Sequence, residues 1–253
     1  MAKAIHTSAK LGKSPATDGD GNPIYNQILL DLSRNGCDLL LSKLEFVRLK
    51  AHHVLHEPGD TLKSAYFCNS GLISILSVFP DGKCVEVGLI GKEGLVGLPL
   101  VAGFRTAATR AIAQIDATAF RVDYETLKTS LKECPGLELR LEQFSQRMTM
   151  QVTQIAACNQ LHEVNQKLAR WLLMSADRIG SNSLPLVQEF LAQMLGTRRA
   201  SVTVSVGVLE KAGLIACTRG EVKIIQRKKL EQAACPCYGM MRQQMREWED
   251  GSR

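Results

Sequence analysis

The first pattern along this chain is a series of short hydrophobic runs separated by turn-forming residues, between residues 46 and 122. Pro80-Asp81-Gly82-Lys83 separates two of these runs and is a strong hairpin signal. The runs are residues 72–79, 84–90, 111–115 and 119–122. Because many short strands with regular turns are typical of a compact antiparallel β-roll, we expect one over residues 25–134, with short helical pieces at its start.

A second pattern begins after Pro135-Gly136, where hydrophobic residues recur at intervals of three and four. They are Leu137, Leu141, Phe144, Met148, Val152 and Ile155. The spacing predicts one amphipathic helix over residues 135–163. A helix of about 25 residues is about 37 Å long. It either lies across its own β-roll or pairs with a second copy, and we expect these residues to form a dimer seam because the roll is too small to cover such a length.

A third pattern, starting at Gln188, fits the helix-turn-helix template. Ala192 occupies the position where only a small side chain lets the second helix pack closely, and Gly196 occupies the turn position that needs a positive φ. The apolar positions between the two helices are Leu191, Leu195 and Val202. Two apolar runs at 214–217 and 222–225 then predict a small hairpin, the wing, so we expect a winged helix-turn-helix domain over residues 164–253.

The residues of the second helix suit the major groove of DNA. An arginine donates two hydrogen bonds to guanine, and serine or threonine hydroxyls reach phosphates or bases. The candidate DNA-binding residues are Gln188, Thr197, Arg198, Arg199, Ser201, Thr203 and, at the tip of the wing, Arg219. Double-stranded DNA is therefore the expected partner.

The distribution of charge agrees with this interpretation. The net charge is +6, from 31 Lys and Arg against 25 Asp and Glu. Residues 1–163 hold 17 of each sign, whereas residues 164–253 hold 14 positive and 8 negative residues. The whole excess lies in the predicted DNA-binding part, as expected for a surface that meets a polyanion.

The N-terminal residues 1–24 lack hydrophobic periodicity and are rich in Ser, Gly, Asp and Lys, so we expect a flexible tail. This segment has no apolar core of a secretory signal, and no stretch of the chain is apolar enough to cross a membrane. We expect a cytoplasmic protein without a membrane partner.

The order of the elements resembles the Crp/Fnr family, the cyclic-AMP receptor and fumarate–nitrate regulators, over nearly all of residues 25–240. The motifs that carry the resemblance are Pro58-Gly59-Asp60, Asn69-Ser70-Gly71, residues 91–97, residues 105–109 and residues 188–213. The resemblance implies an α+β fold and a homodimer that binds a two-fold pseudopalindrome, with RNA polymerase as a further partner. Arg199 matches the guanine-contacting arginine of the family, whereas Ala200 and Val204 replace an acidic base contact and a second arginine, so a different operator is expected.

The resemblance also locates a tentative effector pocket, formed by Gly97, Leu98, Arg105, Thr106 and Thr153. Family members that bind cyclic nucleotides use a Glu for the ribose about ten residues before the phosphate-binding Arg. Here Gly97 and Leu98 supply no carboxylate, and Glu93 lies too far upstream unless the loop is rearranged. A ribose hydroxyl buried without a partner costs about 1–3 kcal/mol, so we expect another effector or none. A cyclic-nucleotide regulator with a rearranged pocket is the alternative.

The chain carries eight scattered cysteines, which we expect to be reduced thiols. No spacing indicates a zinc or iron–sulfur site, so we expect no metal and no cofactor. His52, His53, His56, Cys68 and Cys84 are haem ligands by residue type only, and His52 and His53 would point to opposite faces of a strand. A redox role of Cys235 and Cys237 is less expected than a packed one. No catalytic constellation stands out, so we expect no enzyme.

Overall fold

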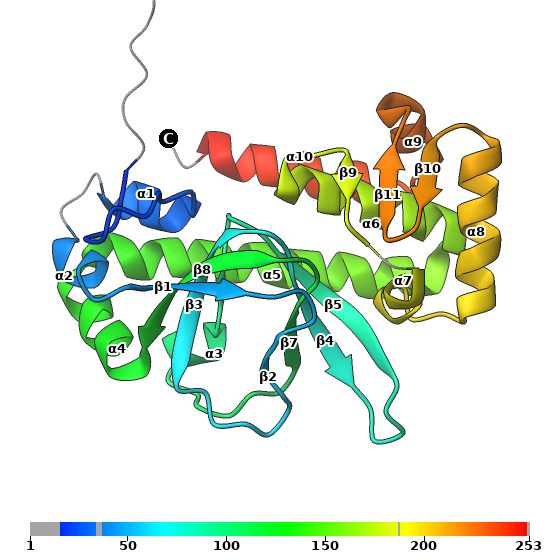
Figure 1. Cartoon of the computed structure of the whole chain (residues 1–253). Coiled ribbons are helices and arrows are strands. Elements are labelled where there is room, and N and C mark those ends of the chain that lie inside the picture. The colour runs from blue at the N-terminus through cyan, green and yellow to red at the C-terminus, as the bar shows by residue number, and fades with distance from the viewer. Residues whose placement is uncertain (1–15, 34–36, 187, 252–253) are drawn as a thin grey trace, which may run out of the picture.

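The computed structural model describes residues 16–33, 37–186 and 188–251. Figure 1 shows a β-roll on one side of a long helix and a smaller helical domain with a short sheet at the other end. The elements of the first half are α1 (Gln27–Ser33), α2 (Asp38–Leu41), β1 (Glu45–Leu49), β2 (Val54–His56), β3 (Ser64–Ser70), β4 (Ile73–Val78), β5 (Cys84–Ile90), β6 (Leu95–Val96), α3 (Leu98–Val101), β7 (Arg110–Ala113), β8 (Ala117–Asp123) and α4 (Tyr124–Glu133). The elements of the second half are α5 (Pro135–Leu161), α6 (Val164–Ile179), β9 (Ser183–Leu184), α7 (Gln188–Met194), α8 (Arg199–Lys211), β10 (Ile215–Thr218), β11 (Glu221–Ile224), α9 (Arg227–Ala233) and α10 (Cys237–Gly251).

Two four-stranded antiparallel sheets form the β-roll, in the orders β1-β8-β3-β6 and β2-β7-β4-β5. The predicted hairpin is confirmed, because β4 pairs with β5 from Ile73 opposite Ile90 to Val78 opposite Cys84. Phe67 and Phe120 are fully buried between the sheets. The predicted α+β class, with roll, long helix and winged domain in that order, is confirmed.

Residues 16–24, which we predicted to belong to a flexible tail, form a closed turn instead. The Asp18 carboxylate accepts hydrogen bonds from the backbone N–H of Asp20 and Asn22, and Thr17 pairs with Pro23. Ile24 is buried at the end of this turn. The prediction was wrong here because a single Asx turn supplies order that hydrophobic periodicity does not reveal. The rest of the predicted tail, residues 1–15, lies outside the described residues.

The structure also corrects the prediction of a dimer seam on α5. Leu137, Leu141 and Phe144 are buried against the β-roll of the same chain, with Met148 packed beside them, and Ile155 is also buried. Phe144 lies so close to Gly94 that a Cβ there would be 2.2 Å from the ring. Among the six seam residues only Val152 is exposed. The pattern identified the buried face of the helix correctly, but its own β-roll covers that face from Leu137 to Met148.

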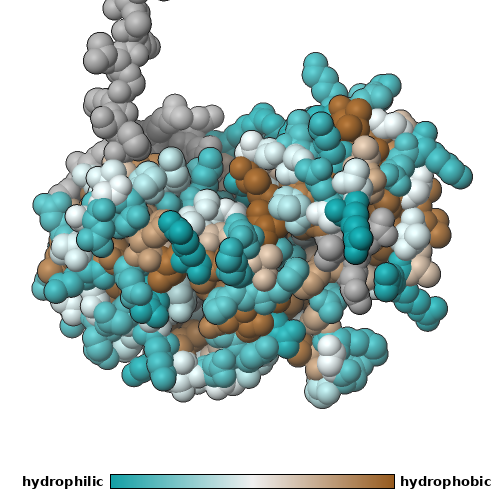
Figure 2. Space-filling view, viewed as in Figure 1, coloured by the Kyte–Doolittle hydropathy of each residue, from teal (hydrophilic) through white to brown (hydrophobic). Residues whose placement is uncertain are grey.

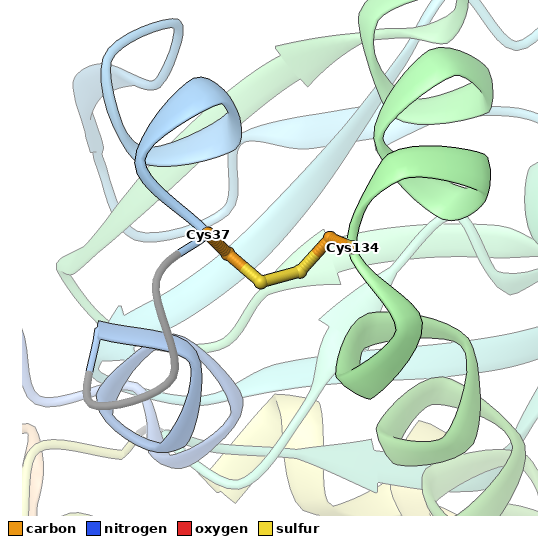
Figure 3. Close-up of a disulfide and its surroundings, with 2 residues drawn as sticks. All are labelled: Cys37 and Cys134. Atoms are coloured by element: carbon orange, nitrogen blue, oxygen red, sulfur yellow. A yellow bond between two sulfur atoms is a disulfide. The ribbon is translucent and has the colours of Figure 1, made fainter.

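Cys37 and Cys134 form a disulfide, contrary to the expectation of reduced thiols throughout the chain. The bond connects the start of α2 to the junction of α4 and α5 (Figure 3). The two residues are 97 positions apart, and only the fold brings their Cα atoms to 5.6 Å. Sequence spacing alone could not reveal this proximity.

One of two hydrophobic clusters in the described part of the chain extends across the β-roll and the C-terminal domain. Leu72, Leu76 and Leu89 of the roll pack in the same cluster as residues of α6, including Trp171. Arg178 of α6 also pairs with Glu93 of the roll at 2.8 Å, and both side chains are largely buried. In the described part of the chain, no helix has the length and apolar character needed to span a membrane.

Candidate nucleic-acid interface

The helices α7 and α8 and the turn between them have the geometry of a helix-turn-helix. Gly196 lies in the turn with φ of 57°, the left-handed conformation that the template requires. The apolar positions Leu191, Leu195 and Val202 are buried, as predicted. Ala192 is half-buried, and its carbonyl accepts a hydrogen bond from the Thr197 N–H at 3.0 Å.

Helix α8 presents one face to solvent at the edge of the molecule that lies farthest from α1 and α4 (Figure 1). Arg199, Ala200 and Thr203 are exposed at its N-terminal end. Val204 and Val208 are exposed by 67% and 47%, and Figure 2 shows apolar surface along this edge. An exposed valine contributes little to the core, but it can contact the methyl group of thymine. The i, i+4, i+8 spacing from Ala200 was the signal for Val204 and Val208, which we did not include among the DNA-binding candidates.

The other predicted residues lie around the same end of α8. Arg198 is the exposed N-cap residue, Thr197 and Ser201 are half-buried, and the Thr203 hydroxyl donates to the Arg199 carbonyl at 3.1 Å. Gln188 is the first residue of α7, and its side chain lies outside the described part of the structure. The start of α8 therefore carries two consecutive exposed arginines, Arg198 and Arg199.

The wing is the hairpin of β10 and β11, which extends through β9 to a three-stranded sheet. Arg219 lies in its tight turn and is exposed. The Cys217 N–H donates to a Glu210 carboxylate oxygen at 2.7 Å, which ties the wing to α8. Arg219 is thus held on the domain that presents α8, where it can contact a phosphate.

A groove separates the start of α8 from the β4–β5 hairpin of the same chain. Asp81 and Lys83 line one wall, and Arg198 and Ser201 line the other. At the end of the groove the turn between α7 and α8 comes close to β5. A Cβ added to Gly196 would lie 2.8 Å from the Val85 Cγ2. His52 also stacks on Phe190 of α7, with ring centroids 4.1 Å apart.

Two known domain families match this chain. Residues 46–134 match the cyclic nucleotide-binding domain, and residues 166–233 match the Crp-like helix-turn-helix domain. Together they cover more than half of the 253 residues and coincide with the β-roll and the winged domain. The chain belongs to the Crp/Fnr family of transcriptional regulators. It is a DNA-binding regulator with a helix-turn-helix domain.

Relatives of known function support this membership. The global nitrogen regulator of Synechocystis sp. is 24% identical over 184 residues, which is 69% of this chain and 82% of that protein. The global nitrogen regulator of Synechococcus elongatus is 25% identical over 185 residues, or 69% of this chain and 83% of that protein. Both alignments extend through most of the relatives' length.

Solved structures share the fold. FixK2 from Bradyrhizobium japonicum has a TM-score of 0.66 at 13% identity, covering 76% of this chain and 98% of that chain. The c-di-GMP responsive global regulator CLP from Xanthomonas campestris has a TM-score of 0.64 at 18% identity, covering 75% and 98%. At these identities the two structures show a shared fold and nothing more.

The predicted effector residues lie on three elements. Gly97 precedes α3 and has φ of 104°, and a Cβ added to it would lie 3.2 Å from Ala65. Leu98, the first residue of α3, is half-buried. Arg105 and Thr106 are exposed in the loop before β7, and the Arg105 guanidinium lies 4.8 Å from the centre of the Tyr124 ring. Their role as a pocket stays a prediction.

Thr153 and Glu93 are each already engaged within the chain. Thr153 is exposed on α5, and its hydroxyl donates to the Thr149 carbonyl at 2.9 Å. The Glu93 carboxylate accepts hydrogen bonds from the Gly91 N–H at 3.1 Å and from Arg178 at 2.8 Å. In this arrangement Glu93 contacts the DNA-binding domain through Arg178.

The histidines differ from their prediction. His52 and His53 lie in the turn between β1 and β2, not in an alternating strand, and His52 has φ of 69°. His56 is on β2, where burial lowers the pKa of its imidazole. Burial raises the pKa of the Cys68 thiol well above its ordinary value. A haem role for these residues or for Cys84 stays untested.

Proposed function

We propose that this regulator binds DNA as a homodimer, with one α8 in each of two successive major grooves. The observation that carries the proposal is the N-terminal end of α8, where Arg198 and Arg199 are exposed to solvent. Arg199 is the base-contacting residue, and Arg219 on the wing is a phosphate contact. Double-stranded DNA in the cytoplasm is its binding partner, RNA polymerase is a further partner in transcription, and no enzymatic activity is assigned.

The exposed face of α5 supports a dimer in a different way from the predicted seam. Thr149, Val152, Thr153 and Ala156 are exposed along it, followed by Leu161 with 73% exposure. Small side chains allow two helices to approach closely, at interaxial distances of about 8–10 Å. We assign this face, opposite the one that packs on the β-roll, to the partner helix.

The effector of the regulator is not cyclic AMP in this proposal. Gly97 and Leu98 carry no acid for the ribose, and the Glu93 carboxylate pairs with Arg178. The alternative, a cyclic-nucleotide regulator with a rearranged pocket, requires Glu93 to exchange Arg178 for the ribose. That exchange would uncouple the β-roll from α6, and it makes a distinct prediction in the experiment below.

Selection of bound sequences from a random duplex pool, with and without cyclic AMP, tests the proposal. We expect a two-fold motif whose half-sites lie about 10 base pairs apart, unchanged by the nucleotide. A motif that appears only with cyclic AMP would favour the alternative. Failure to enrich any motif at low salt would contradict the proposal.

The dimer face is tested by light scattering of the Ala156→Arg variant. Two arginines brought close together in the proposed interface repel each other, so we expect a monomer. Glu133→Arg, on the exposed surface of α4, is the matched control and should stay dimeric. An Ala156→Arg variant that remains a dimer would move the interface elsewhere.

A further inference from the structure

Four side chains of metal-ligand type meet where α5 ends and α10 begins. Cys158 and His162 lie one turn apart at the end of α5, and Cys235 and Cys237 flank Pro236 just before and at the start of α10. Their sulfur and ring nitrogen atoms all lie within 4.8 Å of one another. This cluster departs from the expectation that the cysteines are incidental and bind no metal.

The distances within the cluster fit the edges of a tetrahedral zinc site. The Cys158 and Cys235 sulfur atoms are 3.4 Å apart, and the Cys237 sulfur is 3.6 Å from the His162 Nδ1. With Zn–S bonds of about 2.3 Å and Zn–N bonds of about 2.0 Å, neighbouring ligand atoms are separated by about 3.5–3.8 Å. A disulfide requires about 2.05 Å, so Cys158 and Cys235 are not bonded to each other.

The cluster is shielded from water. Cys158, Cys235 and Cys237 are buried with at most 2% exposure, and His162 is half-buried. Four protein ligands leave no open position for a substrate or water, which is typical of a structural zinc site rather than a catalytic one.

A side-chain amide contacts the cluster from outside. The Gln154 side-chain amide donates to the Cys237 sulfur at 3.1 Å. Outer contacts of this kind orient metal-bound thiolates and reduce their charge.

The charge around the cluster also fits a bound Zn²⁺ ion. Three thiolates and a neutral imidazole around Zn²⁺ carry a net charge of −1, and a buried charge needs an opposite one nearby. Arg170 is 2% exposed beside Cys158 and Cys235, and its Nε has no hydrogen-bond partner among the described residues. Glu86 also lies near Arg170, and burial raises the pKa of its carboxyl group to about 7.

We propose that Cys158, His162, Cys235 and Cys237 bind one Zn²⁺ ion that fastens α10 to the end of α5. The following helix, α6, starts at Val164, directly after His162. The ion therefore lies at the junction between the long helix and the DNA-binding domain, where it would limit their relative motion. Figure 1 shows α10 returning along α6 above α5 from this point.

Metal analysis of the purified full-length protein tests the proposal. We expect about one zinc per chain in the wild type and less than about a tenth of that in Cys235→Ser and His162→Ala, since each variant loses a ligand. Cys84→Ser, a half-buried cysteine on β5, is the matched control and should keep its zinc. Cys237→His retains a ligand at that position and should keep more zinc than Cys237→Ala. This comparison separates the loss of a zinc ligand from a general folding defect.

Replacement of zinc by cobalt identifies the ligands directly. We expect the visible bands of tetrahedral Co²⁺ together with sulfur-to-cobalt charge-transfer bands, which weaken in Cys235→Ser and persist in Cys84→Ser. Removal of the ion by a chelator should lower the thermal unfolding temperature of the wild type but leave that of Cys235→Ser unchanged. A metal-free wild type with free thiols, a Cys158–Cys235 disulfide, or an iron–sulfur chromophore would each overturn the proposal.

Discussion

The indole Nε1–H of Trp171 donates a hydrogen bond of 2.8 Å to the Oε1 of Glu86, which joins α6 of the DNA-binding domain to β5 of the β-roll. The Ser74 hydroxyl donates to the other carboxylate oxygen. Glu86 is 2% exposed, and this burial raises the pKa of its carboxyl group to about 7 despite both hydrogen bonds. The contact between the two domains therefore contains a group that titrates near neutral pH.

We predict that this group makes stability depend on pH. In the unfolded chain Glu86 releases its proton near pH 4.5, whereas in the folded chain it keeps the proton until about pH 7. The folded state binds more protons in this window, so the free energy of unfolding falls as pH rises through it, by a total on the order of 3 kcal/mol. Above about pH 7 the contribution is constant.

Urea unfolding across this pH window, with wild type and Glu86→Gln, measures the effect. The variant keeps a hydrogen-bonding amide but cannot ionise, so its stability should lose this part of the pH dependence. Glu138→Gln, exposed near the start of α5, should retain it. Parallel curves for wild type and Glu86→Gln would show that Glu86 does not titrate in this range.

The Cys37–Cys134 disulfide predicts a redox-dependent stability. It closes a loop of 97 residues, and cross-links of this kind typically contribute about 2–4 kcal/mol by restricting the unfolded chain. Adding a reductant should therefore lower the free energy of unfolding of the wild type by this amount. Cys134→Ser should show the lower value with or without reductant. Equal stability of the oxidised and reduced wild type would argue against the cross-link in solution.

Gly196 predicts a sensitive position in the helix-turn-helix. An added Cβ would be strained at φ of 57° and would meet Val85 at 2.8 Å, so Gly196→Ala should destabilise the protein by about 1–2 kcal/mol. Gly207→Ala is the control, because this glycine lies within α8 with nothing within 4 Å of the added Cβ. That variant should be more stable by about 0.5–1 kcal/mol. Thermal unfolding of both variants checks the pair, and the opposite order would contradict the turn geometry.

Local patterns predicted the elements that depend on local interactions. The β4–β5 hairpin, the long helix and the turn at Gly196 follow from the turn residues and hydrophobic periodicity of neighbouring positions. A periodic pattern also shows which face of α5 is buried. It does not show what covers that face, and Leu141 packs on its own β-roll rather than on a second copy.

The relationships that local patterns missed connect distant parts of the chain. Cys158 and Cys235 are 77 positions apart and do not form a motif of recognised spacing. The Cys37–Cys134 pair and the Glu93–Arg178 ion pair are equally remote in sequence. In each case the side-chain chemistry was visible in the sequence, but the proximity exists only after the strands and helices have packed.

The assignment of α8 as the recognition helix is tested most directly by repeating the duplex selection with Arg199→Ala and Arg219→Ala. Loss of the Arg199 side chain should remove the guanine preference at one position of each half-site, where a good bidentate contact is worth about 1–3 kcal/mol. Loss of Arg219 should weaken binding to all duplexes alike and leave the motif intact. An Arg199→Ala variant that selects the wild-type motif would contradict the account.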